Sequence, residues 1–376
     1  MTIFSAERTK IKDRHLNAKV FFDPNGGVDI ARYDVMQHRD IFELARKMRG
    51  QFWVPSEVNT NKDAIDFKSL SSVEQHIFTA NLKRQILLDS VQGRAPTEAL
   101  ARWVGVPELE TAIIWWTAME QIHNESYSHI IDGVYPSSQE VFDSVCEIDE
   151  IAECSESITK YYDDLIKYSN LYQVAEDYPE YNIKVDLYHL KKLLWLCLHA
   201  INALEGIRFY VSFACSWAFA ENKLMEGNAK IIKLIARDEN LHLALTQKLI
   251  KTTLVNDDSD FIKIREETLD ECNAIMDLAI SQEKDWAGYV FRDGSMLGMN
   301  ENIMCSYVDY IGAQRKKAIN LDPDAEAPKR NPLPWTLRWT KSAAVQNAPQ
   351  ETEIDDYEIG GYKLDIDKDT FADIEL

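Results

Sequence analysis

The chain has 376 residues, 45% of them hydrophobic, and a formal net charge of −21, so it can bury a large core but lacks the clustered basic residues that binding of nucleic acid requires. Its six cysteines include no Cys-x-x-Cys pair, which favours reduced thiols in a cytoplasmic protein over a zinc site or a disulfide framework. We find no signal peptide, and charged residues interrupt the most apolar region, 193–220, so we also expect no membrane span.

In chain order, residues 1–35 are expected to be irregular, with a turn at the Pro-Asn-Gly-Gly of 24–27. The spacing of apolar residues predicts the first three helices over 41–48, 71–89 and 107–131. Ser71 and Glu74 have the spacing of a capping box, and Pro107 suits a first helical turn. Segments 57–66 and 171–184 are the few candidates for extended structure.

The remaining helices are predicted over 138–146, 148–170, 185–222, 227–252, 258–288 and 300–318. Five of the eleven prolines then fall within 323–349, and ten acidic residues face two lysines in 351–376. We therefore expect three parts: an irregular N-terminal segment (1–35), an all-α helical bundle (36–320), and a Pro-containing and then acidic C-terminal tail (321–376). Apolar residues in such a tail often anchor a partner protein.

Four of the predicted helices carry a pattern typical of metal ligands. Two contain Glu-x-x-His, which places both side chains on one helix face, and two others carry a single carboxylate in an apolar setting; the six residues are Glu120, His123, Glu239, His242, Asp89 and Glu205. Bundles with a carboxylate-bridged pair of iron or manganese ions use this combination of ligands. Oxygen and imidazole ligands without thiolates suit Fe or Mn.

The spacing alone is weak evidence, because about one of the eight histidines should follow an acidic residue at this distance by chance. Three histidines follow an acidic residue in this way, because Asp186 and His189 have the same spacing as the two Glu-x-x-His pairs. What favours a metal site is the apolar context of both Glu-x-x-His pairs and the cost of burying four carboxylates without cations. Asp238, beside Arg237, is either a residue that orients a ligating histidine or one half of an ordinary surface ion pair.

Beyond these ligands, several motifs resemble the radical-generating small (beta) subunit of class I ribonucleotide reductase, most closely the class Ia type of bacteria and phages. They are Phe-Trp at 52–53, Leu-Leu-Asp-Ser-Val-Gln-Gly-Arg at 87–94, Glu-x-x-His-x-x-x-Tyr at 120–127, Ala-Leu-Glu-Gly-Ile-Arg-Phe-Tyr-Val-Ser-Phe at 203–213, and Ile-Ala-Arg-Asp-Glu at 235–239. Further matches lie at 226–232, 284–287, 291–296 and 348–351.

This resemblance implies a ferritin-like bundle with a dinuclear iron centre, manganese being the alternative, and the six ligands named above. It implies that Tyr127 carries a stable tyrosyl radical, in an apolar pocket formed by Phe209, Phe213 and Ile235. From the residues alone, Tyr127 could equally be a hydrogen-bonded core tyrosine, and the three apolar residues plain core packing. The resemblance further implies a metal neighbour at Trp116.

The same resemblance implies an enzyme, ribonucleoside-diphosphate reductase, in which this homodimeric subunit activates dioxygen and passes an oxidising equivalent to the large (alpha) subunit. Trp53, Asp238 and His123 would belong to the route outward, with Tyr357 as its last station, and the tail would dock on the large subunit. Two alternatives are another di-iron oxidase or monooxygenase on the same bundle, and a non-enzymatic helical scaffold whose tail recruits a partner.

Overall fold

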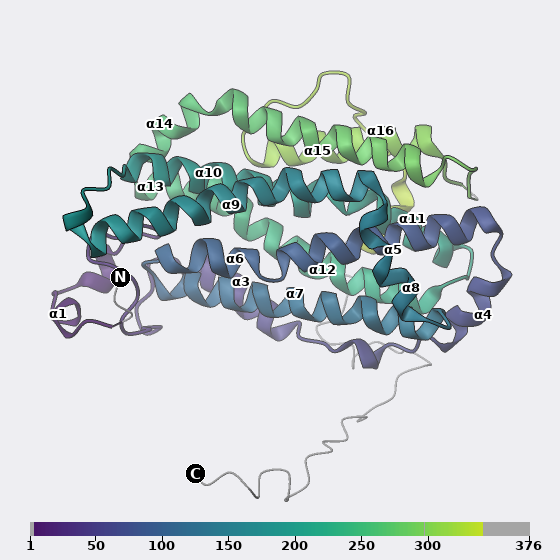
Figure 1. The fold of residues 1–376 in the computed structure, drawn as a ribbon, viewed down its shortest axis with the longest axis horizontal. Helices are drawn as coiled ribbons and strands as arrows, with labels where there is room; N and C mark the ends of the chain where they lie inside the picture. The colour runs from purple at the N-terminus through teal and green to yellow at the C-terminus, as the bar shows by residue number, and fades with distance from the viewer. Residues whose placement is uncertain (1–3, 297, 341–376) are drawn as a thin grey trace, which may run out of the picture.

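The computed structural model describes residues 4–296 and 298–340, and this part of the chain is all-helical, as predicted. Its only extended pairings are two isolated bridges, Phe21 with Val104 and Met296 with Met299. Figure 1 shows long helices running lengthwise in stacked layers, with α3 and α7 on one side and α15 and α16 on the other. None of the described helices is long and apolar enough to cross a membrane.

Most of the predicted helices are present. The principal ones are α3 (Arg39–Gly50), α5 (Ser72–Gln92), α7 (Pro107–Val134), α8 (Ser138–Asp143), α9 (Asp149–Asp177), α10 (Leu187–Ala203), α11 (Tyr210–Glu221), α12 (Glu226–Lys248), α14 (Asp260–Glu267), α15 (Leu269–Val290) and α16 (Glu301–Ala318). The capping box of Ser71 and Glu74 starts α5, and Pro107 is the first residue of α7. In the centre, α5 packs on α7 and α11, while α12 packs on α7, α10 and α11.

The region predicted as one helix over 185–222 is helical from Leu187 to Glu221, apart from a turn at Phe209, but it is irregular in the middle. Between α10 and α11 the chain forms a π-helical segment, η5 (Leu204–Arg208). A π segment contains an extra residue relative to an α-helix, so it changes the direction in which its side chains point. A second π segment, η6 (Leu249–Thr253), follows α12 and leads into α13 (Leu254–Asp257).

The prediction of extended structure over 57–66 was wrong. A short 3₁₀ turn, η1 (Pro55–Glu57), leads into helix α4 (Asn61–Ser69). Asp63 accepts hydrogen bonds from the backbone N–H groups of Gly227 and Asn228, and Asp66 accepts one from Met225. A helix places two residues three apart on one face, so both carboxylates reach the unpaired N–H groups at the start of α12.

The expectation for 171–184 was also wrong, because α9 continues as a helix to Asp177, with the ring of Tyr172 edge-on to that of Trp103. The helix predicted over 258–288 divides at Thr268 into α14 and α15. Sequence patterns also missed several short elements: α1 (Ala6–Thr9), α2 (Arg14–Asn17), α6 (Ala95–Leu100), η7 (Pro334–Thr336) and α17 (Leu337–Thr340).

A buried ion pair connects α5 to α15 beside the irregular segment. Nη2 of Arg84 lies 2.6 Å from Oε2 of Glu283, and both side chains are fully buried. The other oxygen, Oε1 of Glu283, accepts the backbone N–H of Val211 at 3.0 Å. Burial raises the pKa of Glu283, while the charge of Arg84 opposes this shift.

Glu283→Ala should lower the free energy of unfolding by about 3–5 kcal/mol, because it leaves a buried guanidinium without a counter-charge. The control is Glu271→Ala, which removes a half-exposed carboxylate 3.8 Å from Lys192 and should cost less than about 1 kcal/mol. Urea unfolding followed by circular dichroism measures both values. Equal losses in the two variants would contradict the importance assigned to the buried pair.

Candidate metal centre

The six predicted ligands converge in the middle of the bundle. Asp89 comes from α5, Glu120 and His123 from α7, Glu205 from η5, and Glu239 and His242 from α12. Glu239 is 3% exposed and the other five are fully buried. The chain thus places four carboxylates and two imidazoles in its core, where charged groups require compensation.

These residues form two overlapping groups whose ligand atoms lie within 4.8 Å of one another. The Asp89 half of the site consists of Asp89, Glu120, His123 and Glu239, and the Glu205 half consists of Glu120, Glu205, Glu239 and His242. Glu120 and Glu239 belong to both halves and are the two shared carboxylates of the cluster. The arrangement suggests a dimetal site.

Glu120 and Glu239 each turn one carboxylate oxygen toward His123 and the other toward His242. Nδ1 of His123 lies 3.3 Å from Oε2 of Glu120 and 3.3 Å from Oε1 of Glu239. Nδ1 of His242 lies 3.1 Å from Oε1 of Glu120 and 3.4 Å from Oε2 of Glu239. The two halves are therefore nearly symmetric about the shared carboxylates.

The protonation of the ligands follows from this crowding. Burial, and then the charge of Glu120, raises the pKa of Asp89 well above its usual range, and burial together with Glu239 does the same for Glu205. Burial opposes ionisation of Glu120 as well, but its close contacts with His123 and His242 lower its pKa to about 2. Burial lowers the pKa of His242, yet its contacts with Glu120 and Glu239 bring it to about 10.

The donor atoms fit a pair of metal ions. Five of the six residues keep, within the described part of the chain, a buried oxygen or nitrogen that has no hydrogen-bond partner: Oδ1 of Asp89, Oε2 of Glu120, Nδ1 of His123, Oε2 of Glu205 and Oε1 of Glu239. In His242 the nitrogen that faces the cluster is Nδ1, which lies near Glu120 and Glu239. Leaving buried polar atoms unpaired costs about 1–3 kcal/mol each. Oxygen and imidazole donors of this kind suit iron or manganese.

A set of neighbouring side chains fixes the carboxylates from outside. Nε1 of Trp116 donates to Oε1 of Glu120 at 3.0 Å, and Nε2 of Gln92 donates to Oε1 of Glu205 at 2.6 Å. The hydroxyl of Tyr162 in turn donates to Oε1 of Gln92 at 2.8 Å. The sequence analysis assigned no role to Gln92 or Tyr162. Gln92 could have been identified, because it stands three residues after Asp89 on the same helix face, whereas no spacing connects Tyr162 to the site.

Tyr127 reaches the site directly, because its hydroxyl donates to Oδ2 of Asp89 at 2.5 Å. The ring is buried. Burial, and then the charge of Asp89, raises the pKa of the phenol well above its ordinary value. Tyr127 therefore stays protonated at neutral pH, with an acceptor for its proton already in contact.

Asp238 connects His123 to the buried indole of Trp53. Its Oδ2 accepts Nε1 of Trp53 at 2.8 Å and lies 3.4 Å from Nε2 of His123. Its Oδ1 accepts Nε of Arg237 at 3.0 Å. Both residues of this pair are buried, so the alternative of an ordinary surface ion pair was wrong.

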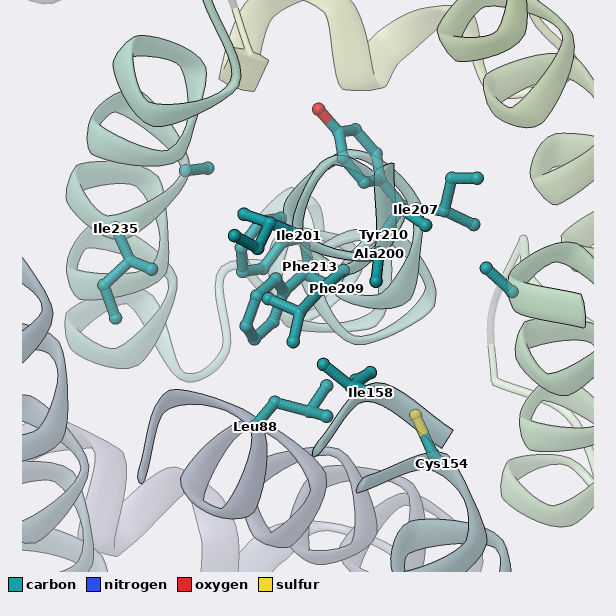
Figure 2. Close-up of a cluster of buried hydrophobic side chains, with 14 of the residues drawn as sticks. Leu88, Cys154, Ile158, Ala200, Ile201, Ile207, Phe209, Tyr210, Phe213 and Ile235 are labelled. Atoms are coloured by element: carbon teal, nitrogen blue, oxygen red, sulfur yellow. The ribbon is translucent and has the colours of Figure 1, made fainter. Parts of the chain in front are cut away.

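The three residues predicted to form an apolar pocket lie in one cluster of buried side chains. Phe209 and Phe213 stack with ring centroids 5.4 Å apart and an interplanar angle of 9°. In Figure 2 the two rings lie above Leu88 of α5, and Ile235 of α12 lies on the helix to their left. Leu88 directly precedes Asp89, so the cluster adjoins the helix that carries this ligand.

Two other predictions have different outcomes. Tyr357 and the acidic tail lie outside the described residues. Asp186 and His189, which share the ligand spacing, are exposed, and Asp186 instead accepts a hydrogen bond from the backbone N–H of Tyr188 at the start of α10. The third occurrence of the spacing is therefore unrelated to the site.

A helical bundle that gathers two Glu-x-x-His pairs and two single carboxylates defines the class of ferritin-like dimetal carboxylate proteins. A family model described as "Ribonucleotide reductase, small chain" matches residues 31–332. The beta subunit of ribonucleoside-diphosphate reductase 1 from Escherichia coli O157:H7 is 45% identical over 374 residues, which cover 98% of each chain. The beta subunit of ribonucleoside-diphosphate reductase from Enterobacteria phage T4 is 42% identical over 94% of each chain.

Among solved structures, the ribonucleotide reductase R2 subunit from Clostridium botulinum superposes with a TM-score of 0.76 at 25% identity, over 91% of this chain and 98% of that one. The chain belongs to the ribonucleotide reductase small-chain family, and its function is that of a ribonucleoside-diphosphate reductase beta subunit. The resemblance seen in the sequence is confirmed. Of the three hypotheses, the comparisons favour the reductase subunit over a separate oxidase and over a non-enzymatic scaffold.

His242→Ala should reduce the bound metal from two ions per chain toward one, because only the Glu205 half contains this imidazole. The matched control is His189→Ala, which removes a histidine of the same spacing from an exposed position and should retain both ions. Elemental analysis after loading with iron or manganese gives the count. Full occupancy in the His242 variant would show that this imidazole is not a ligand.

Proposed function

We propose that this subunit generates and stores a tyrosyl radical on Tyr127 and delivers its oxidising equivalent to the large subunit, which reduces ribonucleotides. The observation that carries the proposal is the 2.5 Å hydrogen bond between the Tyr127 hydroxyl and Oδ2 of Asp89. This bond places an oxidisable phenol in contact with a residue of the candidate metal site.

The six ligands would hold two iron ions, with manganese as the alternative, since oxygen and imidazole donors do not discriminate between them. Bound there, the metal pair would supply the dioxygen-dependent oxidation that the phenol requires. Glu120 and Glu239, which belong to both halves, would contribute to holding both ions, whereas Asp89 and Glu205 would each contribute to one. Trp116 and Gln92 hold Glu120 and Glu205 by hydrogen bonds, so these carboxylates are oriented before any ion is bound.

Oxidising Tyr127 requires removal of an electron and a proton together, because a protonated phenol is difficult to oxidise alone. Asp89 accepts the hydrogen bond from the hydroxyl, so it is the group that can take or relay the proton. A neutral radical persists only where water and reductants are excluded. We assign this role to Phe209, Phe213 and Ile235, which are buried and follow or precede the ligands Glu205 and Glu239 by a few residues.

The route outward runs from His123 through Asp238 to Trp53. One oxygen of Asp238 faces both the imidazole and the indole N–H, and Arg237 fixes the other oxygen. Arg237 also donates to the backbone carbonyl of Gln51 at 2.6 Å, so it ties the Trp53 segment to α12. Tyr357 would receive the oxidising equivalent beyond Trp53.

The large (alpha) subunit is the proposed partner, and the acidic tail with its apolar residues is the proposed docking element. We further propose that the subunit works as a homodimer in the cytoplasm. The six cysteines are unpaired thiols, as expected for a reducing compartment.

Tyr127→Phe should abolish the radical signal in electron paramagnetic resonance while leaving two metal ions bound, because it removes only the phenol. Tyr307→Phe is the matched control. It removes the hydroxyl of another buried tyrosine, which is not part of the candidate site, and it should keep the radical. A tyrosyl signal that persists in the Tyr127 variant would refute the assignment.

Removal of residues 357–376 should abolish nucleotide reduction with the large subunit but leave the radical signal unchanged, because the truncation lies outside the described bundle. A synthetic peptide of the same residues, added to the intact protein, should inhibit by competing for the docking site. Activity that survives the truncation would show that the tail does not dock.

A further inference from the structure

Arg315 of α16 contacts the irregular segment that carries one ligand. Its Nε donates to the backbone carbonyl of Gly206 at 3.1 Å, and its Nη2 donates to the hydroxyl of Tyr210 at 2.5 Å. The guanidinium also lies 5.2 Å from the centroid of the Tyr210 ring. Within the described part of the chain, no carboxylate lies within ion-pair distance of Arg315. This cation therefore binds a peptide carbonyl and a phenol.

Gly206 allows this approach. A Cβ atom at this position would lie 3.2 Å from Cγ of Arg315 on one side and 3.2 Å from Cδ1 of Leu243 on the other. Leu243 directly follows the ligand His242 on α12. Gly206, which directly follows Glu205, is thus enclosed between the aliphatic part of the Arg315 side chain and helix α12, which carries His242.

The backbone of this region relies on side chains from other helices. The backbone N–H of Val211 donates to Oε1 of Glu283, a side chain of another helix, at 3.0 Å. The carbonyl of Arg208 lies 3.5 Å from Nε of Arg84. Figure 2 shows Tyr210 pointing out of the apolar cluster, away from Leu88, and its hydroxyl contacts Arg315 of α16.

Glu205 differs from the other five ligands in its backbone. Those five lie inside α5, α7 and α12, where regular hydrogen bonds fix the direction of each side chain. Glu205 lies in a π segment, whose geometry is rare and is retained only where surrounding contacts stabilise it. Its direction therefore depends on groups outside the segment.

We propose that Arg315 is a positioning residue for the Glu205 half of the site: by holding the carbonyl of Gly206 and the hydroxyl of Tyr210, it keeps the π segment in the form that directs Glu205 toward Glu120, Glu239 and His242. This inference rests on the proposed function, since it requires that the cluster binds two ions. It predicts an asymmetric defect, because the Asp89 half contains no residue of the segment.

The test is titration of metal-free protein with Mn(II), with free ion and spin-coupled pairs measured by electron paramagnetic resonance. Arg315→Met keeps the apolar stem but removes the donors. It should weaken one of the two binding steps by about 10- to 100-fold, as is typical when a residue that orients a ligand is removed, and leave the other step within about two-fold. The matched control on the same helix is Lys317→Met, an exposed position that should change neither step.

Two ligand variants identify which half is affected. The spectrum of Arg315→Met at one ion per chain should match that of Glu205→Ala and differ from that of Asp89→Ala. Equal weakening of both steps, or two unchanged steps, would overturn the inference. If the unaltered protein binds no Mn(II) pair, the proposed dimetal function itself fails, which is a separate result.

A second variant covers the case in which Arg315→Met does not fold, as judged by circular dichroism. Tyr210→Phe removes one of the two groups that hold the guanidinium and keeps the ring beneath it. It should weaken the same binding step in the same direction, by about three-fold or more. An unchanged step in a folded Tyr210→Phe protein would overturn the role given to Arg315.

Discussion

The burial of four carboxylates in one small volume is the constraint on which the rest of this structure depends. Two imidazoles alone cannot neutralise four buried negative charges, so protons or cations must be held there. The surrounding residues match this requirement, because Trp116 and Gln92 donate to carboxylates of the site through uncharged N–H groups. The bundle thus supplies donors that orient the carboxylates but leaves their charge for metal ions to balance.

The two Glu-x-x-His helices form the rigid part of the site. Glu120 and Glu239 each face both imidazoles. A small shift of α7 along α12 would therefore change the distances between these carboxylates and the imidazoles of the other helix. The same two helices also carry Tyr127 and Asp238, on either side of His123. The phenol that we propose is oxidised and the proposed route outward are therefore carried by the same two helices as the shared carboxylates Glu120 and Glu239.

The sequence predicted the helical bundle, and it singled out six side chains that the structure brings together, because helical spacing is a local property and Glu-x-x-His places both donors on one face. It could not separate the real pairs from Asp186 and His189 without the apolar context. Helix α4 was missed because its stability comes from Asp63 and Asp66 capping a helix more than 150 residues away. Tyr162 was missed for the same reason, since tertiary contacts leave no pattern in a single sequence.

The π segment shows most clearly where local reasoning ends. A continuous α-helix over 185–222 would pair all of its interior backbone groups within the helix, yet the chain instead inserts a bulge at Glu205 and compensates it with Glu283 and Arg315 from two other helices. Such a bulge is kept when it serves a function. Here it turns one carboxylate of an otherwise continuous helix toward the centre of the site. The direction of Glu205 consequently depends on contacts from other helices, whereas Glu120 and Glu239 lie within regular α-helices.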